Sequence, residues 1–383
     1  MPGWKVHFDL VADLSRQGRR EKIAAIRAVT QVLTAIPIPP HVRERLNNLN
    51  ILRAVRGTTG IEGVELTEEE VADVVNSEPS APVLPVGRER EQTEVRNAYA
   101  LIQRIQGLLT AEPDRPLTEE LIREFHQVLS QYISYPDNDP GRYRRHSAVE
   151  SGGSFRYPAP GEIPGLMTGF MDWLNRGRGR SLDPIVRAVA AHFLLVSIHP
   201  FGDGNGRTAR AVECYLLFQA RINVTGFYSL ANFYYQNRNE YVNRLNQVRF
   251  ESDPDIGPFI DFALEGLIAE LEEVRRTLID KVRISAFRDY AIDRLRIAGR
   301  LGTSPGKRQL SFLLELGSGT VAFADLLGGH HPLALIHRHV GSRTLRRDLR
   351  ELEDMDLIVV ESGIVRAQLE IMDQFTAWPE PFG

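Results

Sequence analysis

The stretch that decides this chain is HPFGDGNGRTAR, residues 199–210. Apolar residues recur at helical spacing over residues 182–198 before it, and again over residues 208–220 after it. Pro200 and the glycines should end the first helix, because proline lacks a backbone donor and glycine favours turns. The sequence therefore predicts two helices joined by a tight loop.

That loop has the features of an anion site. It leads into a helix N-terminus, where free backbone N–H groups and the helix dipole attract negative charge. Gly202, Gly204 and Gly206 have no Cβ, so an anion can approach their backbone closely. Arg207 and Arg210 are three residues apart and share a helix face, and guanidinium groups suit phosphate oxygens. This pattern favours a phosphate-bearing ligand.

Three more side chains of the stretch suit a metal ligand, a phosphate contact and a general base. Asp203 is a hard oxygen ligand, and proteins typically hold Mg²⁺ with one or two carboxylates plus substrate phosphates. Asn205 can donate from its amide to a phosphate oxygen. His199 ordinarily titrates near neutrality, which suits a general base for a tyrosine, serine or threonine hydroxyl. A purely structural helix-turn-helix is the simpler alternative, but it leaves these residues in register unexplained.

Residues 199–207 resemble the Fic family signature HPFx[D/E]GN[G/K]R at every specified position. The resemblance implies an all-helical core and an enzyme that moves AMP from ATP onto a hydroxyl of a target protein, with Mg²⁺. It implies that His199 deprotonates the hydroxyl and that Asp203 holds the Mg²⁺. The remaining implied roles are phosphate contacts from Asn205 and the Gly204–Gly206 backbone, a β-phosphate contact from Arg207, a γ-phosphate contact from Arg210, and a buried anchor at Phe201.

A second motif lies upstream, at TTGIEG, residues 58–63. It resembles the inhibitory helix pattern [S/T]xxxE[G/N] of some Fic proteins, which implies that Glu62 pairs with Arg210 and displaces the γ-phosphate. A carboxylate in an arginine fork competes with phosphate and repels it. In some family members the same glutamate positions a water that removes AMP, so removal of AMP, or both activities, is the alternative. A nucleotide donor other than ATP also stays open.

Two further segments carry weaker signals. Residues 141–160 predict a β-hairpin around a Gly-Gly turn, which resembles the Fic flap that holds a target segment as an added strand. The resemblance also places adenine near residues 228–235, where Asn232 would hydrogen-bond the base and Tyr235 would stack on it. Aromatic residues at helical spacing are alternatively core residues.

The composition is that of an ordinary globular protein, with 43% hydrophobic and 25% charged residues among 383. No apolar run is long enough to cross a bilayer, and no signal peptide is evident. The single cysteine, Cys214, excludes an internal disulfide and favours a cytoplasmic location. A net charge of −4 argues against a strongly basic nucleic-acid surface.

The chain divides into three expected regions: residues 1–110 with the inhibitory motif, residues 111–298 as the Fic core, and residues 299–383. The last region predicts three helices and a two-stranded hairpin, an order that resembles a winged helix. Its third helix carries Arg343, Arg346, Arg347 and Arg350, which suit phosphate contacts. Residues 301–383 nevertheless hold 8 Lys+Arg against 11 Asp+Glu. Protein interaction or dimerisation is therefore favoured over nucleic-acid binding.

Together these observations predict a mainly α, cytoplasmic protein adenylyltransferase with a Fic all-helical core, a β-hairpin flap and a C-terminal winged-helix-like domain. Its substrates would be ATP with Mg²⁺ and a hydroxyl of a target protein, with the chain itself included among the candidate targets. Glu62 would hold it inactive. The alternatives are an enzyme that removes AMP or does both, and a regulator whose winged helix binds DNA. A homodimer stays open.

Overall fold

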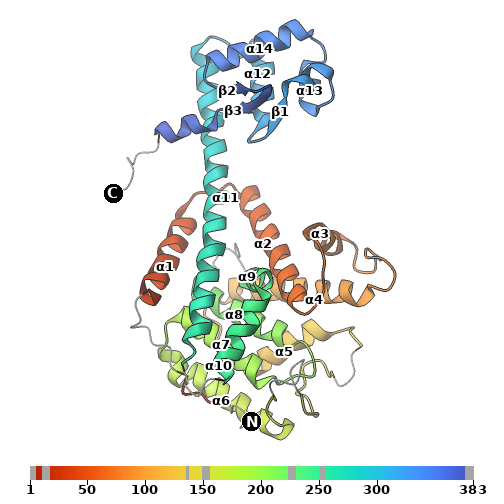
Figure 1. Cartoon of the computed structure of the whole chain (residues 1–383), viewed down its shortest axis with the longest axis vertical. Helices are drawn as coiled ribbons and strands as arrows, with labels where there is room; N and C mark the ends of the chain where they lie inside the picture. Colours follow the sequence, from red (N-terminus) through yellow and green to blue (C-terminus); the bar gives the residue numbers. More distant parts are fainter. Residues whose placement is uncertain are drawn as a thin grey trace. The chain divides into compact units, whose positions relative to one another are not determined.

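The computed structural model describes residues 6–10, 18–134, 138–148, 156–222, 230–250 and 255–375. These residues are mainly helical, as predicted (Figure 1). They form two compact units, Met1–Arg275 and Arg276–Gly383. The division of the chain into three functional regions remains a prediction.

The first unit is built from helices alone, apart from short 3-10 turns, among the residues described. Its helices are α1 (Arg19–Ala35), α2 (Pro40–Ile61), α3 (Glu68–Asn76), α4 (Glu89–Ala111), α5 (Glu119–Ser130), α6 (Ile163–Asn175), α7 (Pro184–Ile198), α8 (Asn205–Gln219), α9 (Leu230–Gln236), α10 (Arg238–Phe250) and the first part of α11 (Gly257–Ile297). The 3-10 turns are η1 (Pro160–Glu162) and η2 (Arg178–Ser181).

Helix α7 is the core of this unit. Every residue of α7 except Pro184 and Arg187 is buried, which is typical of a helix that is apolar all round and enclosed by others. Its start is fixed by Asp183, whose side chain accepts from the Ile185 N–H, and by Pro184 in the first turn. Helix α8 packs along α7, with α4 and α5 against α8. The loop between α7 and α8 is therefore held from several sides.

Helix α2 packs closely against α9 because two glycines face that helix. A Cβ at Gly57 would lie 2.6 Å from the backbone of Ala231 and Asn232. A Cβ at Gly60 would lie 2.4 Å from the ring of Tyr235. Both contacts leave no room for a side chain, so these glycines set how near the end of α2 comes to the rest of the unit.

The second unit has its own core and a small sheet. After the last part of α11 come α12 (Ser304–Leu316), β1 (Thr320–Ala322), α13 (Phe323–Gly328), η3 (Pro332–His337), α14 (Ser342–Asp354), β2 (Ile358–Glu361), β3 (Ile364–Ala367) and η4 (Leu369–Phe375). The sheet order is β1-β3-β2, with both pairs antiparallel. Ser362 and Gly363 join β2 to β3 with φ of 50° and 79°, the geometry of a tight hairpin turn.

The three predicted helices and the hairpin of this region are present, and β1 is an element that the sequence did not predict. Buried leucines of α12 and α14, among them Leu313, Leu345 and Leu349, pack with Phe312 and with Val365 of β3. The winged-helix-like assignment itself remains a prediction. Within the described residues, no helix combines the length and the apolar character that crossing a bilayer requires.

Candidate active site

The loop between α7 and α8 reverses the chain within a few residues. Helix α7 ends at Ile198, and His199 caps it in the left-handed conformation, with φ 51° and ψ 58°. Gly204 is the N-cap of α8 with φ 72°, a conformation that favours glycine. Helix α8 therefore begins at Asn205, three residues earlier than the sequence predicted. Asn205, Gly206 and Arg207 lie in its first turn, where backbone N–H groups have no partner within the helix.

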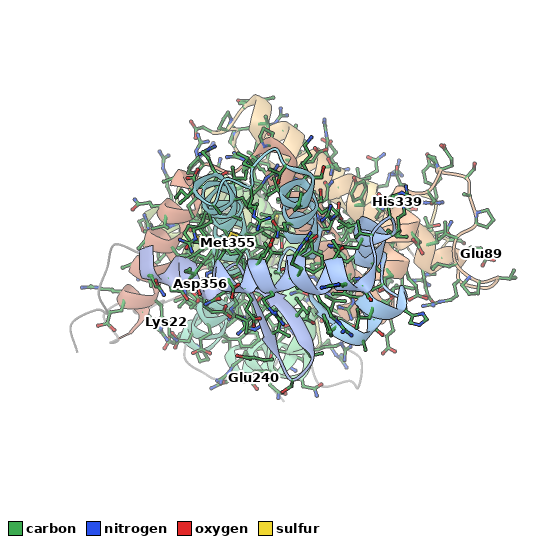
Figure 2. The ribbon with its side chains drawn as sticks, turned by 90° about the horizontal axis from the view of Figure 1, so that it is seen from above. Lys22, Glu89, Glu240, His339, Met355 and Asp356 are labelled. Carbon is green, nitrogen blue, oxygen red and sulfur yellow. The ribbon has the colours of Figure 1, made fainter. Side chains whose placement is uncertain are left out.

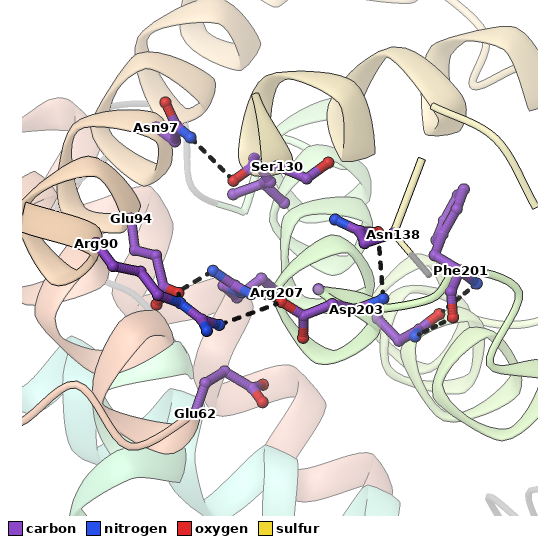
Figure 3. Close-up of polar contacts among 12 residues, drawn as sticks. Glu62, Arg90, Glu94, Asn97, Ser130, Asn138, Phe201, Asp203 and Arg207 are labelled. Atoms are coloured by element: carbon purple, nitrogen blue, oxygen red, sulfur yellow. Dashed lines mark hydrogen bonds and ion pairs between the residues drawn. The ribbon is translucent and has the colours of Figure 1, made fainter. Parts of the chain in front are cut away.

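Asn205 closes the loop on itself. The Phe201 N–H donates to the Asn205 side-chain oxygen at 2.8 Å, and the Asn205 amide donates to the Phe201 carbonyl at 2.9 Å (Figure 3). Phe201 is fully buried, as expected of an anchor, and its ring stacks on His126 at 3.8 Å. In this structure the Asn205 side chain thus fixes the loop, and its contact with a phosphate oxygen remains a prediction.

His126 of α5 is a site residue that the sequence did not reveal. Its Nδ1 accepts from the Gly141 N–H at 2.9 Å, so the ring hydrogen belongs on Nε2, which donates to the Asp203 carbonyl at 2.9 Å. Burial lowers its pKa to about 4, and the neutral ring is therefore the form present at neutral pH. A lone histidine on the buried face of an amphipathic helix is ordinarily predicted to be a core residue, and nothing in the sequence links His126 to Asp203.

Asp203 and Arg207 belong to a cluster of four charges that also includes two residues of α4 (Figure 3). Arg207 Nη2 lies 2.9 Å from Asp203 Oδ2, and Arg207 Nη1 lies 3.4 Å from Glu94 Oε2. Arg90 Nε lies 2.9 Å from Glu94 Oε1, and Arg90 Nη2 lies 3.8 Å from Asp203 Oδ2. Glu94 and Arg90 were not predicted, because both precede the motif by more than a hundred residues.

The donors of Arg207 indicate what this cluster can hold. The Arg207 side chain is 3% exposed, and its Nε and Nη1 have no hydrogen-bond partner among the described residues. Buried guanidinium donors normally have acceptors, so the unpartnered N–H groups of Arg207 can donate hydrogen bonds to a bound anion.

The donor set also fits Mg²⁺. Asp203 is 26% exposed and presents a single carboxylate. Within the part of the chain that the structure describes, no three His, Cys, Asp or Glu side chains are placed to hold a metal ion together. Mg²⁺ is commonly bound by one or two carboxylates together with substrate phosphates. Asp203 therefore suits an ion that arrives with a nucleotide better than a permanent protein cage.

Arg210 is paired with Glu62, the residue that ends α2. Arg210 Nη2 lies 2.6 Å from Glu62 Oε1, and the same guanidinium donates at 3.0 Å to both the hydroxyl and the carbonyl oxygen of Thr58. Burial alone would raise the pKa of Glu62, but the positive charges of Arg210 and Arg207 outweigh it and the pKa is lowered. Glu62 is therefore an anion, in the ion pair that the family resemblance implies.

The Glu62 carboxylate also lies over the first turn of α8. A Cβ built on Gly206 would be 2.3 Å from Glu62 Oε1 and 3.0 Å from Arg210 Nη1. The carboxylate thus occupies the space that the missing side chain of Gly206 leaves at the helix N-terminus. This is the position where an anion is favoured by the helix dipole.

His199 is half-buried at the edge of the same loop. Its ring stacks on Tyr157 with centroids 3.8 Å apart. Burial lowers its pKa to about 3, with further lowering by the nearby positive charges of Arg249 and Arg144. The imidazole is therefore neutral at neutral pH, but with this pKa it is a weaker base than the near-neutral histidine that the sequence predicted, and its role as the general base remains a prediction.

Arg144 ties the predicted flap to the motif. Its Nε donates to the His199 carbonyl at 2.7 Å, and its backbone N–H donates to the Pro200 carbonyl at 2.9 Å. Its terminal nitrogens donate to the carbonyls of His146 and Pro158, at 2.7 and 2.6 Å. The turn of the predicted hairpin, residues 149–155, lies outside the described residues.

The two residues expected near adenine have other contacts in this structure. The Asn232 amide donates to Glu270 Oε1 at 2.8 Å within the core. The Tyr235 ring lies against Gly60 and has the Arg56 guanidinium 5.4 Å from its centroid. Both residues therefore hold α9 in place, and their contacts with a base remain predictions.

Comparison with known proteins adds to this geometry. The model of the Fic/DOC family matches residues 116–217. A protein named Protein adenylyltransferase Fic from Drosophila willistoni is 35% identical over 144 residues, which are 38% of this chain and 27% of that protein. A protein of the same name from Aedes aegypti is 33% identical over 172 residues, 45% of this chain and 32% of that protein. The match thus covers about a third of the length of these relatives.

Solved structures with the same fold span more of the chain. A Fic family protein from Desulfovibrio desulfuricans G20 superposes with a TM-score of 0.56 at 20% identity, covering 91% of this chain and 95% of the other. Residues 134–508 of Fic-1 from C. elegans superpose with a TM-score of 0.57 at 24% identity, covering 68% and 72%. Residues 116–217, which contain the signature at residues 199–207, are therefore a domain of the Fic/DOC family, and the solved structures share the helical fold around it.

Proposed function

We propose that this protein transfers AMP from ATP to a hydroxyl side chain of a target protein. The observation that carries the proposal is the pair of buried arginines at the start of α8. Arg207 has unused donors, Arg210 holds a carboxylate, and a neutral His199 lies on the same loop. The names of the relatives, Protein adenylyltransferase Fic, support the same activity.

The reaction is a displacement at the α-phosphorus. The acceptor hydroxyl oxygen forms a bond to the α-phosphorus, and the bond from that phosphorus to the bridging oxygen of the leaving pyrophosphate breaks. The hydroxyl proton passes to the neutral imidazole of His199. Arg207 and the free N–H groups of the first turn of α8 stabilise the charge that develops on the phosphates. Asp203 would hold Mg²⁺, which when bound neutralises phosphate charge.

Glu62 would keep the enzyme inactive by occupying the γ-phosphate position. Two unit charges 4 Å apart interact by about 4 kcal/mol at the effective dielectric of a protein surface, so a γ-phosphate beside an ionised Glu62 would be strongly disfavoured. ATP would then bind without the contact to Arg210 that orients its α-phosphorus. Removal of the Glu62 side chain should therefore activate transfer.

Four proteins test this proposal: the native chain, Glu62→Gly, His199→Ala and the double variant. Each is incubated with ATP and Mg²⁺, with a mixture of soluble proteins as acceptors, and intact masses are measured for AMP adducts. Glu62→Gly should raise labelling at least tenfold, because Arg210 becomes available to the γ-phosphate. The double variant should show none, because the hydroxyl keeps its proton. Equal labelling by Glu62→Gly and the double variant would rule out His199 as the base.

Removal of AMP is a second candidate, and the charge of Glu62 favours it. An ionised carboxylate close enough to His199 to interact with it electrostatically could orient a water toward a phosphodiester. The test is a target protein already carrying AMP. Release of AMP by the native chain but not by Glu62→Gly would support this activity, and release by neither would exclude it.

The second unit has a candidate role of its own, in binding a nucleic-acid backbone. Helix α14, which lies between the labelled His339 and Met355 in Figure 2, exposes four arginines on one side. They are Arg343, Arg346, Arg347 and Arg350, and they line a recess of about 920 Å³. Among the described residues, only Arg347 of the four has an ion pair. Arg343 lies in the first turn of α14, at the positive end of the helix dipole, where a cation is disfavoured unless an anion binds.

A duplex-binding assay at several salt concentrations tests this role. Binding that weakens steeply as salt rises, and that is lost in Arg343→Ala/Arg346→Ala, would support it. Binding that is unaffected by that double substitution would exclude α14.

A further inference from the structure

A recess of about 290 Å³ lies in the first unit where α6 ends, α7 begins and α8 ends. Its polar side chains include Asn175 of α6, Arg180 of η2, Arg187 in the first turn of α7 and Gln219 of α8. The loop of residues 199–204 joins the opposite ends of α7 and α8, which have 15 residues each. At a rise of about 1.5 Å per residue, the recess lies roughly 20 Å from the candidate active site.

Arg187 is the single arginine of α7, a helix whose other residues are almost all buried and apolar. Burying part of a guanidinium costs free energy unless acceptors take its hydrogen bonds. Its Nη2 donates to Gln219 Oε1 at 3.3 Å, and its Nε is buried without a hydrogen-bond partner. Within the described part of the chain, Gln219 is thus the sole acceptor for this guanidinium.

The hydrogen bonds that the two arginines do make are weak. The Gln219 amide is oriented by its own donation to the Arg115 carbonyl at 2.9 Å, which leaves its oxygen for Arg187. Arg180 Nη1 donates to the Asn175 carbonyl at 3.4 Å. The contacts made by Arg187 and Arg180 are both longer than an ordinary N–H to oxygen hydrogen bond. Each guanidinium therefore has donors that a ligand would satisfy better.

No carboxylate neutralises these two charges, since neither arginine forms an ion pair with another described residue. Asp183, the N-cap of α7, pairs with an arginine of α1 at 2.6 Å. Asp114 also lines the recess, and its carboxylate pairs with Arg221 at 3.6 Å. Burial lowers the pKa of Arg187, and the nearby charge of Arg180 lowers it further.

The charge and the donors of the recess suit an oxyanion of the phosphate class. Two like charges in one recess repel each other, and an anion bound to both removes that repulsion. Guanidinium groups match phosphate oxygens in geometry, and two of them balance the charge of a dianion. Leu174 and Leu216 line the same recess, so an organic group attached to the phosphate would lie against apolar surface.

We propose that Arg180 and Arg187 form a binding site for a phosphate or phosphomonoester dianion, separate from the candidate active site. Arg187 supplies a half-buried guanidinium held by the central helix, and Arg180 supplies an exposed one from η2. The inference is independent of the proposed function, because no residue of the recess belongs to the motif at residues 199–210.

The test measures binding of inorganic phosphate and, in parallel, of O-phosphoserine by calorimetry at constant ionic strength. The variants are Arg180→Gln and Arg187→Gln. The matched control is Arg176→Gln, because Arg176 is an exposed arginine of the same segment that does not line the recess. Each recess variant should raise the Kd of phosphate at the recess about tenfold, because a charge-assisted hydrogen bond is lost. The control should bind as the native chain does.

Phosphate is also expected at the candidate active site, so Arg207→Gln completes the set. This variant should keep the binding event that Arg180→Gln loses. Phosphate binding that disappears in Arg207→Gln and is unchanged in Arg180→Gln would place the anion at the motif alone and overturn the inference.

The second probe identifies the source of the phosphate group. Tighter binding of O-phosphoserine than of inorganic phosphate would indicate a phosphomonoester, and equal binding would indicate the free ion. Arg180 is exposed, so its substitution should leave the fold intact. Arg180→Gln therefore decides the outcome even if Arg187→Gln does not fold.

Discussion

Gly206 is the residue over which the Glu62 carboxylate lies, at the N-terminus of α8. The atoms that a Cβ would meet there belong to the flexible ends of Glu62 and Arg210. The protein can accommodate a methyl group by moving those ends, so its stability should hardly change. A bound phosphate cannot move away in the same manner without losing the backbone N–H groups of the helix.

We therefore expect Gly206→Ala, made in the Glu62→Gly background, to weaken ATP binding at least tenfold while the melting temperature stays within a few degrees. Calorimetric titration and thermal unfolding measure the two quantities. ATP binding as tight as in the parent would show that the phosphates do not approach α8 at Gly206.

His199 should make the stability of the protein depend on pH. Its pKa is lowered to about 3 by burial and by neighbouring positive charge, from an ordinary value of 6.5. Between pH 6.5 and pH 3, His199 is therefore protonated in the unfolded chain and neutral in the folded chain. The folded state has its full stability from this residue above pH 6.5 and loses it as the pH falls toward 3.

Unfolding by urea at pH 7 and pH 5 tests this dependence. The native chain should lose more stability over that interval than His199→Ala, by on the order of 1 kcal/mol once the exposed part of the ring is allowed for. A loss of equal size in both proteins would contradict the lowered pKa. Comparing the two proteins cancels the carboxylates and the other histidines, which they share.

At the scale of single residues, the sequence predicted the groups that a contiguous motif contains. His199, Asp203, Arg207 and Arg210 lie together as expected, and Glu62 reaches Arg210 from α2. The supporting residues His126 and Glu94 were missed. They come from two other helices, α5 and α4, and their contacts depend on tertiary packing that no local pattern encodes.

At the scale of the element, the packing of α2 determines where Glu62 lies relative to Arg210. Gly57 and Gly60 let it lie against α9, and a Cβ at Gly57 would meet backbone atoms, which cannot move aside as a side chain can. Gly57→Ala should therefore force the two helices apart, lower the free energy of unfolding by about 1–3 kcal/mol, and loosen the Glu62–Arg210 pair. AMP transfer by this variant should exceed that of the native chain.

Gly107→Ala is the matched control, because Gly107 is an exposed position of α4 with no atom within 4 Å of an added Cβ. It should stabilise the helix by about 0.5–1 kcal/mol and leave transfer unchanged. Urea unfolding and adduct mass spectrometry measure both variants. Native levels of transfer in a destabilised Gly57→Ala would show that the packing of α2 does not control Glu62.

Elements with a clear apolar period were predictable, and short or glycine-rich ones were not. Helix α7 is apolar on all sides and was predicted with its end at Ile198. The start of α8 was predicted three residues late, because glycines are typical of loops and both Gly204 and Gly206 were assigned to the loop. Only Gly204 lies outside the helix. Strand β1 has three residues, too few for an alternating pattern to stand out.

At the scale of the whole molecule, the sequence predicted the fold class and the family but not the division that the structure shows. The boundary between the two units falls within α11, a continuous helix of 41 residues, and no proline or glycine follows Gly266 in this helix to mark it. Phe287, Ala291 and Leu295 of that helix belong to the core of the second unit. The expected division between residues 298 and 299 therefore lies within this unit.

We propose that this chain transfers AMP and that Glu62 holds it inactive. The most direct measurement incubates Glu62→Gly with Mg²⁺ and ATP labelled on the α-phosphate and, in parallel, with ATP labelled on the γ-phosphate. Protein-bound label should appear from the α-labelled nucleotide only, should fall at least tenfold with Glu62 restored, and should vanish in the His199→Ala double variant. Label retained from the γ-phosphate would show that the chain transfers a phosphoryl group and not AMP, and equal α-labelling with and without Glu62 would show that Glu62 does not inhibit transfer.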